Sequence, residues 1–101
     1  MNTQDIADAR VYDDNTVHAH DGSIVYAYNG STVHAHKGST VRAYDDSTVY
    51  AHDGSIVYVH DDSTVYAFND STVYAYDSSK VCAYDGSKVY VHDDSRVYEV
   101  E

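Results

Sequence analysis

Residues 47–76 read STVYAHDGSIVYVHDDSTVYAFNDSTVYAY, so one phrase of eight residues recurs with few changes. The phrase is Ser-Thr-Val-Tyr-Ala, an aromatic residue and two residues typical of turns. Outward from this stretch, Val recurs every eight residues from position 17 to position 97, and Ser does so from 23 to 95. A fixed period of this kind predicts a repeat architecture, in which each unit stacks on its neighbours.

Each unit combines a strand with a corner. Thr-Val-Tyr-Ala-Tyr alternates with a period of two, which predicts a half-buried strand of five residues. Asp-Gly-Ser, Asp-Asp-Ser or Asn-Gly-Ser then supplies three residues suited to a turn. We expect the constant Val and Ala positions, and the corner Ser, to face inward. The Thr and aromatic positions then face outward, with their polar tips in water.

Alternate units differ, and this difference predicts the size of a coil. The odd units contain Val25, Val41, Val57, Val73 and Val89, and the even units contain the other Val positions of the series. The small inward position is Ala in the even units from 19 to 83, whereas it mixes Ala and Val in the odd units. Sorting the units by threes, as a coil of 24 residues would require, gives no such separation. We therefore predict an all-β, two-sided parallel β-solenoid (β-helix) with 16 residues per coil, between five and six coils and a length of about 28 Å.

The ends of the chain depart from the repeat. Residues 9–101 form the predicted solenoid domain and residues 1–8 a short N-terminal cap segment, in which Thr3–Asp8 would form one helical turn with Ile6 as a plug. Near the other end, Glu99 occupies an inward position, which predicts that strand pairing stops there. Alternatively this edge meets a second copy of the chain, and we favour the resulting end-to-end homodimer.

Composition limits the classes of function. Seventeen acidic residues oppose six basic ones, for a net charge of −11, which argues against direct nucleic-acid binding and favours a basic protein as partner. The lone Cys82 excludes an internal disulfide framework. The start MNTQDIADA does not have the pattern of a secretory signal, and no apolar run is long enough for a bilayer. We therefore expect no membrane association and a cytoplasmic location.

Once the coil is fixed, the corners of the odd units stack into an acidic edge. Its predicted members are the following carboxylates: Asp13, Asp14, Asp45, Asp46, Asp61, Asp62, Asp77, Asp93 and Asp94. Lys80, Lys88 and Arg96 replace Thr near the end of the chain, where they would offset the acidic charge or discourage edge pairing.

Outward aromatic positions stack in the same way. On the odd side they form an aromatic face, predicted to cover the thin core or to serve as a partner surface: Tyr26, Tyr28, Tyr44, Tyr58, Tyr74, Tyr76 and Tyr90. On the even side, His18 and His34 share one column and His20, His36 and His52 the next. Strand neighbours about 5 Å apart could share a Zn²⁺ or Ni²⁺ ion. Substitution of Tyr by His within the repeat explains the pattern equally well.

No signal for catalysis is present. The sequence contains no Gly-rich phosphate loop, no HExxH motif and no nucleophile elbow, so we expect a non-enzymatic protein without a cofactor. Cys82 replaces Tyr in an outward column, and we interpret it as a substitution within the repeat that carries no catalytic role.

The octads STVYAYDGS and STVRAYDDS resemble the tandem octapeptides of bacterial and phage β-solenoid proteins. They are also loosely similar to the 16-residue coils of bacterial ice-nucleation proteins, although outward Tyr and His replace the Thr rows of ice-binding surfaces. The resemblance covers residues 9–98 and implies the architecture alone.

Two functions follow from these features. A charge of −11 over about 28 Å is about 0.4 charge per Å, against about 0.6 for duplex DNA. The first hypothesis is therefore a nucleic-acid-mimicking inhibitor of phage type, anti-CRISPR or anti-nuclease, that acts in the cytoplasm of the host cell. The alternative is a structural or self-assembling repeat protein, such as a spacer or fibre segment. Ice or metal binding ranks below both.

Overall fold

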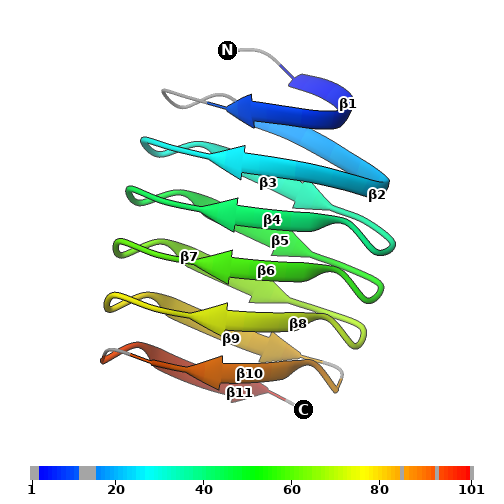
Figure 1. Ribbon diagram of the computed structural model, residues 1–101. Helices are drawn as coiled ribbons and strands as arrows, with labels where there is room; N and C mark the ends of the chain where they lie inside the picture. Colours follow the sequence, from blue (N-terminus) through cyan, green and yellow to red (C-terminus); the bar gives the residue numbers. More distant parts are fainter. Residues whose placement is uncertain (1–2, 12–15, 85, 93, 101) are drawn as a thin grey trace.

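The computed structural model describes residues 3–11, 16–84, 86–92 and 94–100, and they form a β-solenoid of stacked coils (Figure 1). Strand pairing is parallel throughout this part, which contains strands and turns without any helix. From β2 (Thr16–Ala27) onward, each paired residue lies opposite the residue sixteen positions along, as Val33 does with Val49 and Val49 with Val65. The predicted 16-residue coil and two-sided parallel architecture are confirmed, with about five turns and extents of 31 × 24 × 16 Å.

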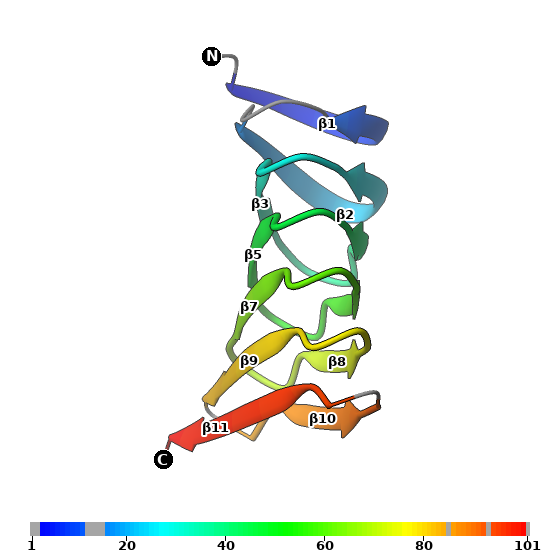
Figure 2. The same cartoon turned by 90° about the vertical axis from the view of Figure 1, so that its left-hand side faces the viewer.

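The coils build two walls, seen edge-on in Figure 2. Strand β2 (Thr16–Ala27) passes from one wall to the other, so its two halves belong to different walls. The even wall continues with β3 (Thr32–Ala35), β5 (Thr48–Ala51), β7 (Thr64–Ala67), β9 (Lys80–Tyr84) and β11 (Arg96–Val100). The odd wall continues with β4 (Thr40–Ala43), β6 (Ile56–Val59), β8 (Thr72–Ala75) and β10 (Lys88–Val91).

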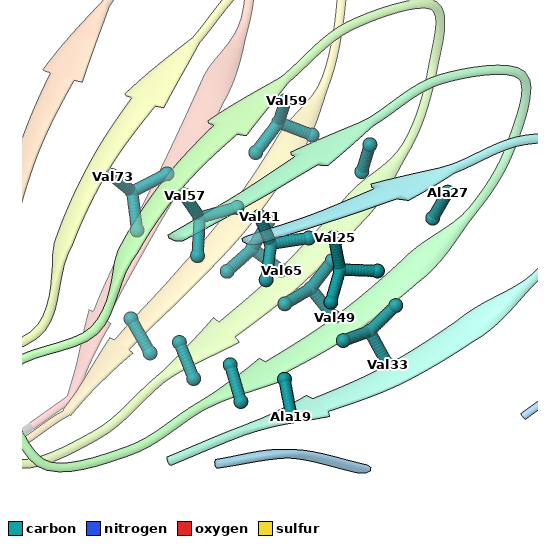
Figure 3. Close-up of a cluster of buried hydrophobic side chains, with 14 of the residues drawn as sticks. Ala19, Val25, Ala27, Val33, Val41, Val49, Val57, Val59, Val65 and Val73 are labelled. Carbon is teal, nitrogen blue, oxygen red and sulfur yellow. The ribbon is translucent and has the colours of Figure 1, made fainter. Parts of the chain in front are cut away.

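A thin core lies between the walls (Figure 3). Val and Ala alternate with outward residues along each strand, and those from Val25 to Val81 are fully buried. The corner serines from Ser23 to Ser79 are also buried, as predicted, and their hydroxyls can bond the backbone there: Ser39 Oγ donates to the His36 carbonyl at 2.6 Å. Such bonds let two sheets approach closely at little cost in unpaired polar groups. Ser87 is an exception, because its Oγ is buried without a hydrogen-bond partner among the described residues.

Most strands are one residue shorter than the predicted five, and their corners are correspondingly one residue longer than the predicted three. Most strands have four residues, and the aromatic residue that follows already opens a β-turn. Both central residues of a turn have positive φ, as in Asp45 (58°) and Asp46 (64°), which is the conformation of a type I′ turn. Asp, Asn and Gly recur here because they tolerate the left-handed region better than other residues.

The N-terminal segment corrects one prediction. Residues Thr3–Val11 form strand β1, not a helical turn, and β1 lies parallel to β2 at the top of the stack in Figure 1. Thr3–Ile6 pairs with the even-wall half of β2 and Asp8–Val11 with its odd-wall half, with a register shift between Ile6 and Asp8. An extended segment can use the exposed edge of β2, whereas a helical turn would leave that edge unpaired.

The other end corrects a second prediction. Strand β11 pairs with β9 through Glu99 opposite Ala83 and Val100 opposite Tyr84, so pairing does not stop at Glu99. Backbone hydrogen bonding therefore continues through a position that carries a carboxylate in place of Ala.

Candidate functional site

The acidic edge is built from stacked turns of the odd units. The Gly30 amide donates to the Asp45 carbonyl at 2.9 Å, Asp46 to Asp61 at 3.1 Å, and Asp62 to Asp77 at 3.2 Å. These bonds hold successive turns in register, so their carboxylates form rows along one edge. The exposed members within the described residues are Asp45, Asp46, Asp61, Asp62, Asp77 and Asp94. Asp13, Asp14 and Asp93, also predicted, lie outside the described residues.

Little basic charge offsets these carboxylates. His60 Nδ1 lies 3.5 Å from Asp77 Oδ2, an ion pair only when the imidazole is protonated. Within residues 16–84, 86–92 and 94–98, no lysine or arginine nitrogen lies within 4.0 Å of a carboxylate of this edge. The edge therefore presents negative charge directly to solvent.

Two aromatic columns cover the odd wall next to this edge. Tyr58, Tyr74 and Tyr90 stack at centroid separations of 5.0 and 5.1 Å, and the Arg42 guanidinium lies over the Tyr58 ring at 4.6 Å. The neighbouring column follows the chain of rings Tyr28, Tyr44, His60, Tyr76 and His92, with separations between 4.8 and 5.2 Å. Tyr26 takes its predicted place in the first column as the register partner of Arg42. The structure thus brings the residues of the predicted aromatic face together. Arg42, His60 and His92 occupy three of the positions in its two columns.

The even wall gathers the histidines as the repeat predicted. His18 stacks on His34 at 4.7 Å and His34 on Tyr50 at 4.9 Å, while His36 stacks on His52 at 5.5 Å in the next column. His20 belongs to β2, and its side chain lies outside what is described. Burial lowers the pKa of His34 below 6.5, and the neighbouring His18, His36 and His52 lower it further.

The metal hypothesis gains no support from this geometry. Face-to-face stacking leaves the nitrogen lone pairs, which lie in the ring planes, side by side and not directed at one point. Across the described part of the chain, no group of three or more His, Cys, Asp or Glu side chains is arranged to hold a metal ion. A site shared by the five histidines stays a prediction.

A groove that sequence reasoning missed lies at the corner between the odd and even walls, near β9 and β11. It encloses about 600 Å³ and is lined by Asp62, Ser78, Lys80, Asp94 and Arg96. The sequence could have indicated this groove through three departures from the repeat. Lys80 and Arg96 replace Thr, and Ser78 stands where other odd corners carry Asp or Gly. Only the coil brings these three units side by side.

Comparison with protein-family models, with curated proteins and with solved structures finds no match to this chain. Among the residues described, no helix is of the length and apolar character needed to cross a membrane.

Proposed function

We propose that this protein is a non-enzymatic acidic rod whose odd-corner edge occupies the DNA-binding channel of a basic protein, such as a nuclease or a CRISPR effector. The observation that carries this proposal is the stacking of exposed carboxylates, two per coil in the turns at Asp45–Asp46 and Asp61–Asp62. At about 4.8 Å per coil these two turns carry about one charge per 2.4 Å, compared with one per about 1.7 Å for duplex DNA.

Rigidity supports the same proposal. The turn residues are held by backbone bonds between coils, such as that from the Asp46 amide to the Asp61 carbonyl. A partner would therefore lose little binding free energy to the ordering of this surface. Such a decoy would act in the cytoplasm, that of the host cell if a phage encodes it, as inhibitors of this type do.

The test is displacement of labelled duplex DNA from a panel of basic DNA-binding proteins, measured by fluorescence anisotropy at several salt concentrations. We expect displacement that weakens steeply as salt rises. The double variant Asp45→Asn/Asp46→Asn should weaken displacement more than Asp53→Asn/Asp70→Asn, which removes the same charge from the exposed corners of the even units. Absence of displacement at low salt would refute the decoy, and equal effects of the two variants would refute the edge as its site.

The second candidate function is structural, an end-to-end assembly of rods. It is favoured by the last described coil, where Tyr90, Val91 and Tyr98 are 48%, 44% and 51% exposed. Strands β10 and β11 end the two walls, so each has one paired neighbour among the described strands. An edge with exposed apolar side chains favours pairing with another chain.

Sedimentation velocity over a range of protein concentrations tests the assembly. We expect dimers in the wild type and a shift to monomers in Val91→Lys, because a charged residue on an edge strand opposes pairing. Lysine at the half-buried Thr72 of β8, a strand that is paired on both sides, adds the same charge away from the edge strands and should leave the dimer in place. Concentration-independent monomers in the wild type would exclude this function.

A further inference from the structure

The groove next to β9 and β11 lies where four departures from the repeat meet. Ser78 stands in a corner row in which Asp46, Asp62 and Asp94 also lie, and Lys80 and Arg96 continue the outward column of Thr64. In the same strand, Cys82 takes the outward place that Tyr66 holds one coil earlier. Three of these four residues, Ser78, Lys80 and Arg96, line one groove.

The charges lining the groove are balanced. Asp62 and Asp94 supply two carboxylates, and Lys80 and Arg96 supply two cations that stand side by side as register partners. Neither cation comes within 4.0 Å of a carboxylate belonging to the described residues. The groove therefore offers separate anionic and cationic contacts, which a zwitterion can satisfy together.

Beside the groove, the aromatic column of the even wall lacks one ring. The stack runs from His18 through His34 and Tyr50 to Tyr66, where it stops because Cys82 follows in the register. Tyr98 comes next in the same column, and its side chain is 51% exposed. Tyr66 and Tyr98 are thus two coil rises apart, about 9.6 Å, with only a thiol side chain at the level between them.

On the odd wall, the equivalent column accepts a planar group in place of a ring. Arg42 occupies the register position between Tyr26 and Tyr58, and its guanidinium lies 4.6 Å from the Tyr58 centroid. The planar ring of a ligand can lie at the corresponding position of the even-wall column, over the side chain of Cys82. A contact between sulfur and the aromatic ring would then add to the stacking.

We propose that this surface binds a free aromatic α-amino acid, with its ring between Tyr66 and Tyr98 at the level of Cys82. Its α-carboxylate would then contact Lys80 and Arg96, and its α-ammonium would contact Asp62 and Asp94. Alternate residues on one face of a strand lie about 7 Å apart, so the ring position at Cys82 and the head-group position at Lys80 are adjacent. Asp62 and Asp94 also belong to the acidic edge, but this inference does not rest on the decoy proposal.

Titration with L-tryptophan tests the site, because the chain contains no Trp and the indole emission therefore reports on the ligand alone. We expect saturable binding that Cys82→Ser retains and Cys82→Tyr abolishes, since Tyr restores the repeat residue and fills the level. Lys80→Thr, also a return to the repeat residue, should weaken binding about tenfold, the effect of losing one charged hydrogen bond. Arg42→Tyr on the opposite wall is the matched control and should leave binding unchanged.

Tryptamine and indole-3-propionate, which each lack one charge of the head group, should bind more weakly than L-tryptophan. Circular dichroism establishes that each variant is folded. Undiminished binding by folded Cys82→Tyr, equal binding of tryptamine, or no saturable binding of L-tryptophan, L-tyrosine and L-phenylalanine to the wild type would overturn the proposal. None of these results bears on the displacement of DNA.

Discussion

At the scale of the residue, the turns depend on a backbone conformation that few side chains accept. Gly54 has φ 79°, and a Cβ added there would meet nothing within 4 Å. At the equivalent position of other units, Asp62 and Asp70 hold φ values of 64° and 66°. The cost of a side chain at Gly54 therefore comes from the backbone and not from crowding, whereas a Cβ at Gly86 would lie 2.9 Å from Asp70 Oδ1.

We expect Gly54→Ala to lower the free energy of unfolding by about 1 kcal/mol, because Ala is strained at positive φ. Gly54→Asn should cost less, since the short polar side chain of Asn tolerates this region. Urea unfolding of both variants measures the difference. Equal losses for Ala and Asn would show that something other than φ limits this position.

The buried serines form different hydrogen bonds in different units of the repeat. The Ser47 amide donates to Ser63 Oγ at 3.1 Å across one coil, while Ser55 Oγ donates within its own turn to the His52 carbonyl at 2.7 Å. The sequence predicted that these serines face inward. It did not distinguish bonds within a turn from bonds between coils, because both need only a hydroxyl at the same repeat position.

At the scale of the element, the outward columns behave as ladders. Adjacent coils place identical or related rings about 5 Å apart, so each column couples residues sixteen positions apart. The column of His18, His34, Tyr50 and Tyr66 combines imidazoles at one end with phenols at the other. Protonation of these imidazoles would therefore place positive charge at one end of the even wall.

Acid should weaken the wild type more than His34→Tyr. The pKa of His34 is lowered from 6.5 in the folded chain, first by burial and then by His18, His36 and His52, so the unfolded chain binds the proton more readily. The stability that His34 provides is complete above pH 6.5 and is lost as pH falls from 6.5 through the lower pKa of the folded state. His34→Tyr, which copies Tyr50 of the next coil, removes this loss.

Urea midpoints at pH 7.5 and 5.5 for the two proteins measure the effect of His34 together with its interactions with His18, His36 and His52. Parallel loss of stability in both proteins would show that His34 does not contribute. The flanking groups described along these columns are the three histidines and Tyr50.

At the scale of the whole molecule, the net charge of −11 opposes the compact state. The odd corners stack exposed carboxylates at every described coil from Asp45 to Asp94, so repulsion between neighbouring turns adds to the overall effect. Added NaCl screens this repulsion, because it shortens the Debye length from about 30 Å to about 3 Å. We therefore expect it to raise the melting temperature by about 5 °C.

Thermal melts followed by circular dichroism measure this response. Asp45→Asn/Asp46→Asn should raise the melting temperature at low salt and reduce the salt response, because it removes two stacked charges. A melting temperature that falls with salt would indicate that favourable ion pairs outweigh repulsion in this molecule.

The sequence by itself determined the coil and its two walls. Residues sixteen positions apart must lie over one another, so the differences between odd and even units predicted which side chains share a column and which face the core. Only the tertiary structure decided the rest. The extended path of Thr3–Val11, the pairing through Glu99 and the groove of Asp62, Lys80 and Arg96 all depend on edges and corners that come together when separate coils stack, and a local pattern of eight residues carries no information about them.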